Sequence, residues 1–295
     1  MMNPLFKKKK AAMFLFVAPV VILFSIIIVI PLIQSAAMSF TEWDGINKAV
    51  FNGVNNYKRL FASRDLKISI RNSLLYSAIL TVYQIGIGTL LAYFLVNFRI
   101  KGKRFFKDIY FFPVLLSVSV VAQLWISIYH GDFGLVNQMA GLFGSDWKQN
   151  WLNEPVKGII AIVIAESWKG MGYHMLIIYA AMKNVPNVYY EASVIDGADK
   201  KQQFFHITLP LTVSTIKVSV VMCITYGFRA FEMIYLMTGG GPGNSSYTMP
   251  IMMYKALFSL QKYGYGSAIA VVIVIICVGM MLIINKLTER FDVQY

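Results

Sequence analysis

Two closely spaced pairs of charged side chains lie inside two long apolar runs of this 295-residue sequence. Glu166 and Lys169 are three residues apart in one run, and Arg229 and Glu232 have the same spacing in the next. Charges at membrane depth are costly, so such side chains usually face protein or water rather than lipid. Two interpretations stay open: a polar pathway between two spans, or structural pairing and snorkelling of these side chains.

Two tyrosines, Tyr173 and Tyr226, fall at levels similar to those of the charges. A tyrosine offers an apolar ring face and a hydroxyl group, and a sugar ring needs that mixture in a binding site. We therefore place both tyrosines with the four charged residues in a candidate substrate pathway.

The remaining reactive residues form no catalytic or metal-binding pattern. His130, His174 and His206 are far apart, and both cysteines, Cys223 and Cys277, lie in apolar runs, as small buried side chains do. The sequence contains no GxSxG or HExxH motif and no phosphate-binding GxxxxGK[ST] loop. We expect a protein that is not an enzyme, has no metal site and binds no cofactor itself, so energy for active transport would come from another chain.

Composition is typical of a polytopic membrane protein. Hydrophobic residues make up 57% of the sequence and charged residues 14%, and the mean hydropathy is +0.60. The net charge of +13 fits basic cytoplasmic loops and contact with lipid headgroups. No basic module stands apart from the apolar runs, so we expect no nucleic acid partner.

The apolar runs predict an all-α polytopic membrane protein with six transmembrane helices and both termini in the cytoplasm. The expected parts are a basic cytoplasmic N-terminus (1–10), a retained first transmembrane helix (11–39), an outer loop (40–68), a core with five further spans (69–285) and a cytoplasmic tail (286–295). The five spans of the core are expected at about 69–97, 109–129, 157–182, 211–237 and 264–284.

A charged, helix-forming segment, Glu191–Pro210, connects spans four and five on the predicted cytoplasmic side. Pro186 favours a helix start, and Asp196-Gly197 favours a turn, because glycine adopts backbone angles that other residues reach only at a cost. Lys200–Gln203 is too polar for lipid. The segment therefore predicts two short helices joined at a glycine and presented to a partner.

The spacing of this segment resembles the EAA loop of permease subunits in bacterial ABC importers. That pattern runs E-A-A, three residues, G, nine residues and I-x-L-P, and this sequence has Glu191-Ala192-Ser193, Gly197 and Ile207-Thr208-Leu209-Pro210 at those spacings. Only Ser193 departs from it. Other motifs resemble carbohydrate importers of the maltose, glycerol-phosphate and multiple-sugar group, and the first permease of their heterodimeric pair: Asn72-Ser73, Phe111-Phe112-Pro113, Gly134-Leu135-Val136-Asn137, Trp151-Leu152, Ile195-Asp196-Gly197-Ala198 and Met237-Thr238-Gly239-Gly240-Gly241-Pro242.

The resemblance implies the transmembrane domain of a type I ABC importer of the bacterial cytoplasmic membrane, carrying a sugar or oligosaccharide. The implied partners are a second homologous permease, an extracytoplasmic solute-binding protein, membrane lipid, and two cytoplasmic ATPase subunits that bind ATP and Mg²⁺. The ATPase would be coupled through the loop 186–210, with Glu191, Ala192, Ser193, Asp196, Gly197, Ala198, Leu209 and Pro210 as the matching residues. By the resemblance, the positions of substrate contacts in the flanking spans fall on Lys169, Gly170, Tyr173, Cys223, Tyr226, Gly227 and Ala230, with Gly227 and Ala230 in place of expected asparagines. The candidate pathway is therefore Glu166, Lys169, Gly170, Tyr173, Tyr226, Gly227, Arg229 and Glu232.

Two other functions stay open at this stage. A permease of the same importer class for a different solute would have the same EAA loop. A secondary transporter would show a repeat architecture or an ionisable coupling site at the midplane, and no repeat is evident in this sequence.

Overall fold

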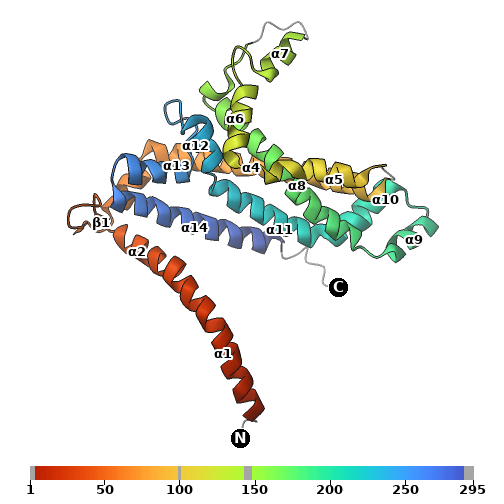
Figure 1. The fold of residues 1–295 in the computed structure, drawn as a ribbon, viewed down its shortest axis with the longest axis horizontal. Helices are drawn as coiled ribbons and strands as arrows, with labels where there is room; N and C mark the ends of the chain where they lie inside the picture. The colour runs from red at the N-terminus through yellow and green to blue at the C-terminus, as the bar shows by residue number, and fades with distance from the viewer. Residues whose placement is uncertain (1–3, 99–100, 143–147, 289–295) are drawn as a thin grey trace. The chain divides into compact units, whose positions relative to one another are not determined.

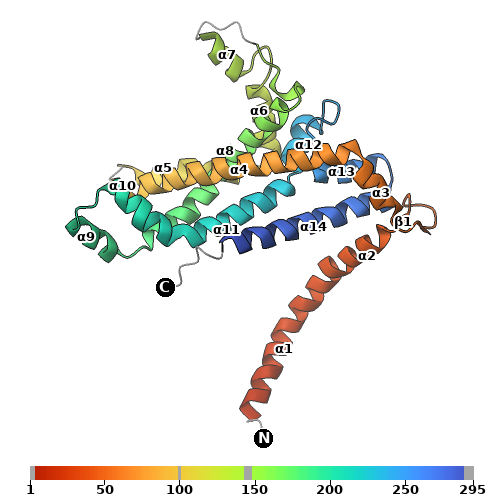
Figure 2. The same ribbon diagram turned by 180° about the vertical axis from the view of Figure 1, so that it is seen from behind.

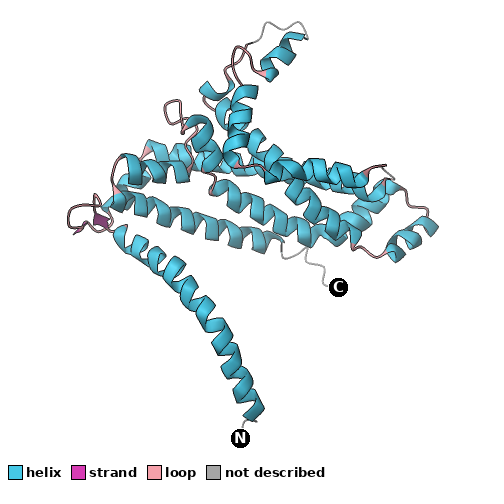
Figure 3. Cartoon of the chain, in the orientation of Figure 1, coloured by secondary structure: helices cyan, strands magenta, loops and turns pink. Residues whose placement is uncertain are grey.

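The computed structural model describes residues 4–98, 101–142 and 148–288. Most of this range is helical (Figure 3), and its only sheet is an antiparallel pair, β1 (Thr41–Glu42) and β2 (Val50–Phe51), with Thr41 opposite Phe51. The predicted all-α class is therefore confirmed. Of the predicted terminal segments, residues 1–3 and 289–295 lie outside the described range.

Fourteen α-helices are described, and Figure 1 labels most of them. They are α1 (Pro4–Phe24), α2 (Ile30–Met38), α3 (Asn55–Ala62), α4 (Arg64–Asn97), α5 (Lys103–Phe111), α6 (Val118–Ile128), α7 (Leu135–Leu142), α8 (Lys157–Lys183), α9 (Asn187–Ile195), α10 (Lys200–Gln203), α11 (Leu209–Phe228), α12 (Glu232–Thr238), α13 (Met249–Tyr254) and α14 (Tyr263–Thr288). Short π-helical turns occupy Ser25–Val29, Phe204–Thr208 and Lys255–Ser259, and 3₁₀ turns occupy Phe112–Leu115 and Trp151–Asn153.

The chain forms two compact units. The first comprises Met1–Ser63 with Met253–Val272, and the second comprises Arg64–Met252 with Ile273–Tyr295. In the first unit, the buried amide of Asn56 donates to the carbonyl oxygens of Ser39 at 2.9 Å and Thr41 at 2.8 Å. These two bonds fix α3 to the C-terminal end of α2 and to β1, because a buried amide that lost its partners would be destabilising.

The second unit is built around α4, α8 and α11, which run alongside one another in both views (Figures 1 and 2). Their shared core contains Ala92 and Leu95 of α4, Met175 and Ile178 of α8, and Cys223 of α11. Because small and large side chains alternate here, the helix axes approach closely enough to bury the polar side chains described below.

Four helices are long and apolar enough to cross a membrane: Phe14–Met38, Arg64–Asn97, Lys200–Phe228 and Tyr263–Lys286. A fifth is obtained if the bent pair Lys103–Leu115 and Val118–Ile128 counts as one span. Helix α8, the predicted span four, is not among them, since polar residues in its middle lower its mean hydropathy. By length and composition, the described residues therefore provide four to five candidate spans.

The predicted third span, 109–129, is wrong as a single helix. The chain bends by 99° between Leu115 and Val118. Leu116 and Ser117 are extended there, and the Ser117 hydroxyl accepts a hydrogen bond from the Val120 amide at 3.3 Å. A side chain that caps the new helix compensates for the backbone bonds lost at the break.

The predicted fifth span, 211–237, is also wrong in its outer part. Helix α11 ends at Phe228, and α12 begins only at Glu232. The Thr248 hydroxyl donates to the buried carbonyl oxygen of Ala230 at 2.9 Å, which satisfies the backbone at this break. Arg229 and Glu232 are therefore not neighbours on one helix, as their spacing predicted.

We expect the substitution Gly172→Ala to destabilise the second unit. A Cβ atom at Gly172 of α8 would collide with the carbonyl oxygen of Tyr110 and lie 2.8 Å from Cα of Phe111. Overpacking of this kind costs roughly 1–3 kcal/mol. The measurement is thermal unfolding of the purified protein in detergent.

The matched control is Gly86→Ala on α4, where a Cβ atom would meet no atom within 4 Å. A helical glycine-to-alanine change gains about 0.5–1 kcal/mol when space permits. The two substitutions should therefore shift the unfolding temperature in opposite directions. Equal shifts would contradict the close α5–α8 contact.

Candidate functional site

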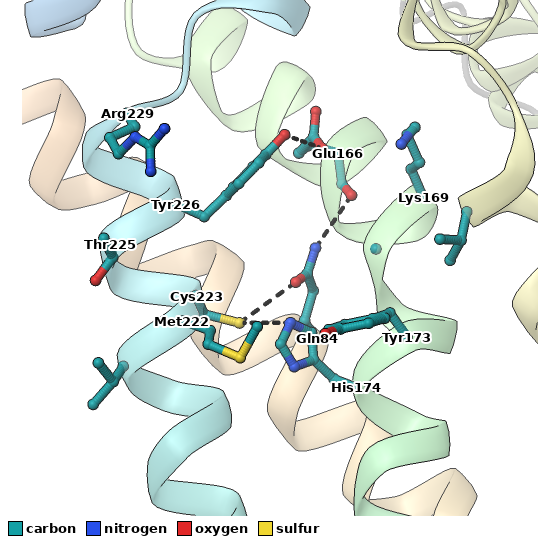
Figure 4. A pocket seen from close by; sticks show the side chains of 13 residues that line it. Gln84, Glu166, Lys169, Tyr173, His174, Met222, Cys223, Thr225, Tyr226 and Arg229 are labelled. Carbon is teal, nitrogen blue, oxygen red and sulfur yellow. Dashed lines mark hydrogen bonds between the residues drawn. The ribbon is translucent and has the colours of Figure 1, made fainter. Parts of the chain in front are cut away.

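A cavity of about 470 Å³ is lined by α4, α8 and α11 together with Val114 (Figure 4). Six residues of the predicted pathway line it: Glu166, Lys169, Gly170, Tyr173, Tyr226 and Arg229. Its wall also contains polar and sulfur-containing residues outside the predicted pathway: Gln84, His174, Met222, Cys223 and Thr225.

Two residues of the predicted pathway do not line the cavity. Gly227 faces α4, where an added Cβ atom would lie 2.6 Å from Cα of Ser77. Glu232 is the first residue of α12, which begins after the interruption that follows α11. The Glu232 prediction treated 211–237 as one helix, and the break after Phe228 removes the regular spacing on which it depended.

Glu166 organises the upper wall of the cavity. It is only 4% exposed, and its carboxylate accepts a hydrogen bond from the Tyr226 hydroxyl at 2.8 Å. Gln84 Nε2 donates to the backbone carbonyl oxygen of Glu166 at 3.3 Å. Gly170 makes this possible, because a side chain at Gly170 would collide with the Gln84 amide. One residue of α8 is thereby bonded to both α4 and α11.

Cys223 continues this network toward the lower wall. Its thiol donates to Gln84 Oε1 at 3.5 Å, and its sulfur lies 3.2 Å from Nε2 of His174. Cys223 is 1% exposed and His174 is 6% exposed. Polar residues inside apolar runs were the available sequence signal for Gln84 and His174, but sequence spacing could not show that both meet Cys223.

The cavity can bind a ligand with both apolar and hydrogen-bonding surfaces. Tyr173 and Tyr226 provide rings and hydroxyl groups, while Lys169 and Arg229 provide cationic donors on either side of Glu166 (Figure 4). Such a mixture orients a polar ligand without requiring one sign of charge. Within the described ranges, no group of three or more His, Cys, Asp and Glu side chains could hold a metal ion.

The segment between α8 and α11 contains the predicted first short helix, α9, which ends at the predicted turn at Gly197. The predicted second short helix is wrong as a separate element, because α10 is the first turn of a continuous helix, Lys200–Phe228. Gly197 has φ of +78°, and its amide donates to the Val194 carbonyl at 3.1 Å. The Ala198 amide donates to the Ser193 carbonyl at 2.9 Å. These two bonds form a Schellman motif, which requires the left-handed conformation that glycine adopts most readily.

Side chains tie α9 to the start of the next span. Gln203 Nε2 donates to the Ser193 hydroxyl at 2.9 Å, and the hydroxyls of Tyr190 and Thr208 are 2.9 Å apart. Asp199 caps α10 in a capping box with Gln202. While these bonds are intact, α9 is therefore expected to move together with α11.

The outer surface of α9 combines an acid with apolar side chains. Glu191, Ala192 and Asp196 are exposed, and Ile195 is 86% exposed. Ser193 is only 8% exposed and faces its own chain, so a partner seated on the exposed surface would not meet it. Ala198 and Leu209 are half-buried, whereas Pro210 is exposed.

Residues 84–293 match the protein family described as "Binding-protein-dependent transport system inner membrane component". The chain belongs to this family. It is a permease, a multi-pass component of the inner membrane and not an enzyme, which confirms the family and the location predicted from the sequence.

Individual relatives agree with this assignment. The permease is 33% identical over 282 residues to "Probable ABC transporter permease protein YurN" of Bacillus subtilis, covering 95% of this chain and 96% of that one. It is 32% identical to "Multiple sugar-binding transport system permease protein MsmF" of Streptococcus mutans, covering 89% and 90%.

A solved structure shares the fold. The crystal structure of a bacterial ABC transporter involved in the import of the acidic polysaccharide alginate matches with a TM-score of 0.84 and 23% identity, covering 98% of the permease and 99% of that chain. The predicted importer architecture is thus supported at the level of the fold.

We expect Tyr226→Phe to destabilise the permease, because the buried Glu166 carboxylate loses its hydrogen-bond donor. Leaving such an acceptor unsatisfied costs roughly 1–3 kcal/mol. The control is Tyr173→Phe, since no hydrogen bond of the Tyr173 hydroxyl is present among the described residues. Thermal unfolding in detergent should separate the two variants, and equal unfolding temperatures would contradict the Tyr226–Glu166 bond.

We expect Ser193→Ala to loosen α9 and α10 locally, because Gln203 loses its acceptor. A net loss of about 1 kcal/mol corresponds to roughly fivefold faster hydrogen exchange by local opening. Hydrogen–deuterium exchange of residues 187–203 measures this directly. The control is Ala192→Ser, at the exposed residue next to Ser193. Its hydrogen-exchange rates over residues 187–203 should stay within twofold of those of the unsubstituted permease.

Proposed function

We infer that this permease carries a sugar or oligosaccharide across the cytoplasmic membrane after delivery by an extracytoplasmic solute-binding protein. One observation carries the proposal: two of the helices that line the cavity, α8 and α11, are the two that the α9–α10 segment joins. A force applied to that segment would therefore reach the cavity along two helices. The name of the Streptococcus mutans relative supports a sugar as the cargo.

The proposed topology has six spans, with α8 counted as one of them and both termini in the cytoplasm. A helix with a polar middle can cross a membrane when other helices enclose it. Helix α8 meets this condition, because Glu166, His174 and Ser167 in its middle are all buried. A second, homologous permease would complete the pathway, as in a heterodimeric importer.

The proposed energy source is a pair of cytoplasmic ATPase subunits, which bind the ATP and Mg²⁺. Their contact with the permease would be the exposed surface of α9, where Glu191 lies near Val194 and Ile195. The apolar side chains would enter a groove on the ATPase, and the carboxylate would accept hydrogen bonds at its edge. Asp196, Gly197 and Ala198 would set the angle at which the helix enters.

Transport would follow from two states of the permease with different contacts to the ATPases. Closure of the ATPases favours one arrangement of α8 and α11, and their separation favours the other. The bonds Ser193–Gln203 and Tyr190–Thr208 keep α9 attached to the start of α11 during this exchange. The cavity would then open to one side of the membrane at a time.

The chemistry of the cavity suits a saccharide. Sugar rings have apolar faces and many hydroxyl groups, and the cavity offers the Tyr173 and Tyr226 rings with donors at Lys169 and Arg229. Gln84 and Glu166 add an amide and a carboxylate on the same wall.

We expect Glu191→Lys and Gly197→Pro to abolish uptake while membrane insertion stays intact. Charge reversal removes the acceptor from the ATPase groove, and proline cannot adopt φ of +78°. The assay is uptake of the saccharide bound by the partner binding protein, in proteoliposomes that contain both permeases and the ATPases.

The control is Asp108→Lys, which makes the same charge reversal on an exposed residue of α5, outside the α9–α10 segment. It should retain most of the uptake. Normal transport by Glu191→Lys or Gly197→Pro would exclude coupling through this segment, and the amount of each permease in the membrane fraction must match.

A further inference from the structure

The lower wall of the cavity brings together three donors that favour soft metal ions. They are the Cys223 thiol, the His174 imidazole and the thioether of Met222, the residue before Cys223 (Figure 4). His174 lies on α8, whereas Met222 and Cys223 lie on α11. Thiolate and thioether sulfur select Cu(I) and related ions, and imidazole nitrogen is a good ligand for the same metals.

We propose that Cys223, His174 and Met222 form a binding site for a monovalent soft metal ion of the Cu(I) and Ag(I) class. The site has one cysteine, one histidine and one methionine ligand. Its methionine distinguishes it from Zn²⁺ and Ca²⁺ sites, whose ligands are cysteine, histidine and acidic side chains. Its ligands share the cavity wall with the proposed cargo, but its occupancy does not depend on what the permease transports.

The distances fit an ion that lies between sulfur and nitrogen, with the imidazole proton on Nδ1. Cys223 Sγ and His174 Nε2 are 3.2 Å apart. With the bond lengths of zinc sites as a guide, about 2.3 Å to sulfur and about 2.0 Å to nitrogen, the sulfur–metal–nitrogen angle at this separation is roughly a right angle. A trigonal angle of about 120° would need a sulfur–nitrogen distance about 0.5 Å longer. The other ring nitrogen, Nδ1, has no hydrogen-bond partner among the described residues, so no bond opposes a small rotation of the imidazole.

Charge balance selects a monovalent ion. Binding converts the thiol to a metal thiolate and releases one proton to water, with no change of oxidation state. A thiolate with a monovalent ion is neutral overall, which suits a site where Cys223 and His174 are almost fully buried. A divalent ion would leave a positive charge in a cavity that Lys169 and Arg229 also line.

The first test measures Ag(I) binding to the full-length permease, purified in detergent, by isothermal titration calorimetry. We expect one tight site in the unsubstituted protein and at least tenfold weaker binding in Cys223→Ser and in His174→Asn. Cys277→Ser is the matched control, because Cys277 is the other free cysteine and lies elsewhere, on α14. Equal affinity of the unsubstituted protein and Cys223→Ser would overturn the proposal.

The second test needs no substitution and therefore does not depend on how the variants fold. Ag(I) should protect Cys223 from alkylation by N-ethylmaleimide at least tenfold more than it protects Cys277 in the same sample, as read by mass spectrometry of the two peptides. Equal protection of both cysteines would mean that Ag(I) binds each thiol alone, without the other two ligands, and would overturn the proposal. Both tests are independent of uptake, so failure of the transport proposal would leave their results unchanged.

Discussion

The second unit depends on one constraint: α8 carries charged and polar side chains through its middle and must be enclosed by other helices. Glu166, Ser167 and His174 are buried there, in a helix too polar to face lipid along its length. The structure meets the cost of burial with hydrogen bonds from neighbouring helices. Tyr226 of α11 bonds the Glu166 carboxylate, and Gln84 of α4 bonds the backbone beside it.

The same enclosure creates the cavity, and the α9–α10 segment joins two of the helices that line it. Because α8 and α11 both contribute polar side chains, their facing surfaces leave space that apolar packing would have filled. The segment that joins them is short and well bonded, with a Schellman motif at Gly197 and a capping box at Asp199. A rigid connector transmits a displacement better than a flexible loop, since fewer soft backbone torsions absorb it.

Much of this protein follows from local sequence. Gly197 marks the turn because one residue must adopt a left-handed conformation, and the spacing from Glu191 to Pro210 carries the family resemblance without any tertiary information. The positions of the apolar runs likewise predict most of the long helices, because membrane thickness sets their length. Breaks were harder to predict: the interruption after Phe228 is stabilised by Thr248, a residue distant in the sequence.

The sequence by itself determined the family, the glycine turn of the α9–α10 segment and the helix that bears the charged pair Glu166 and Lys169. Only the tertiary structure decided which side chains meet. Cys223 contacts His174 across 49 residues of sequence and Gln84 across 139, and Ser193 turns toward its own chain rather than a partner. The reason is physical: turns and helix lengths depend on interactions within a few residues, whereas a cavity depends on the rotation and close approach of whole helices.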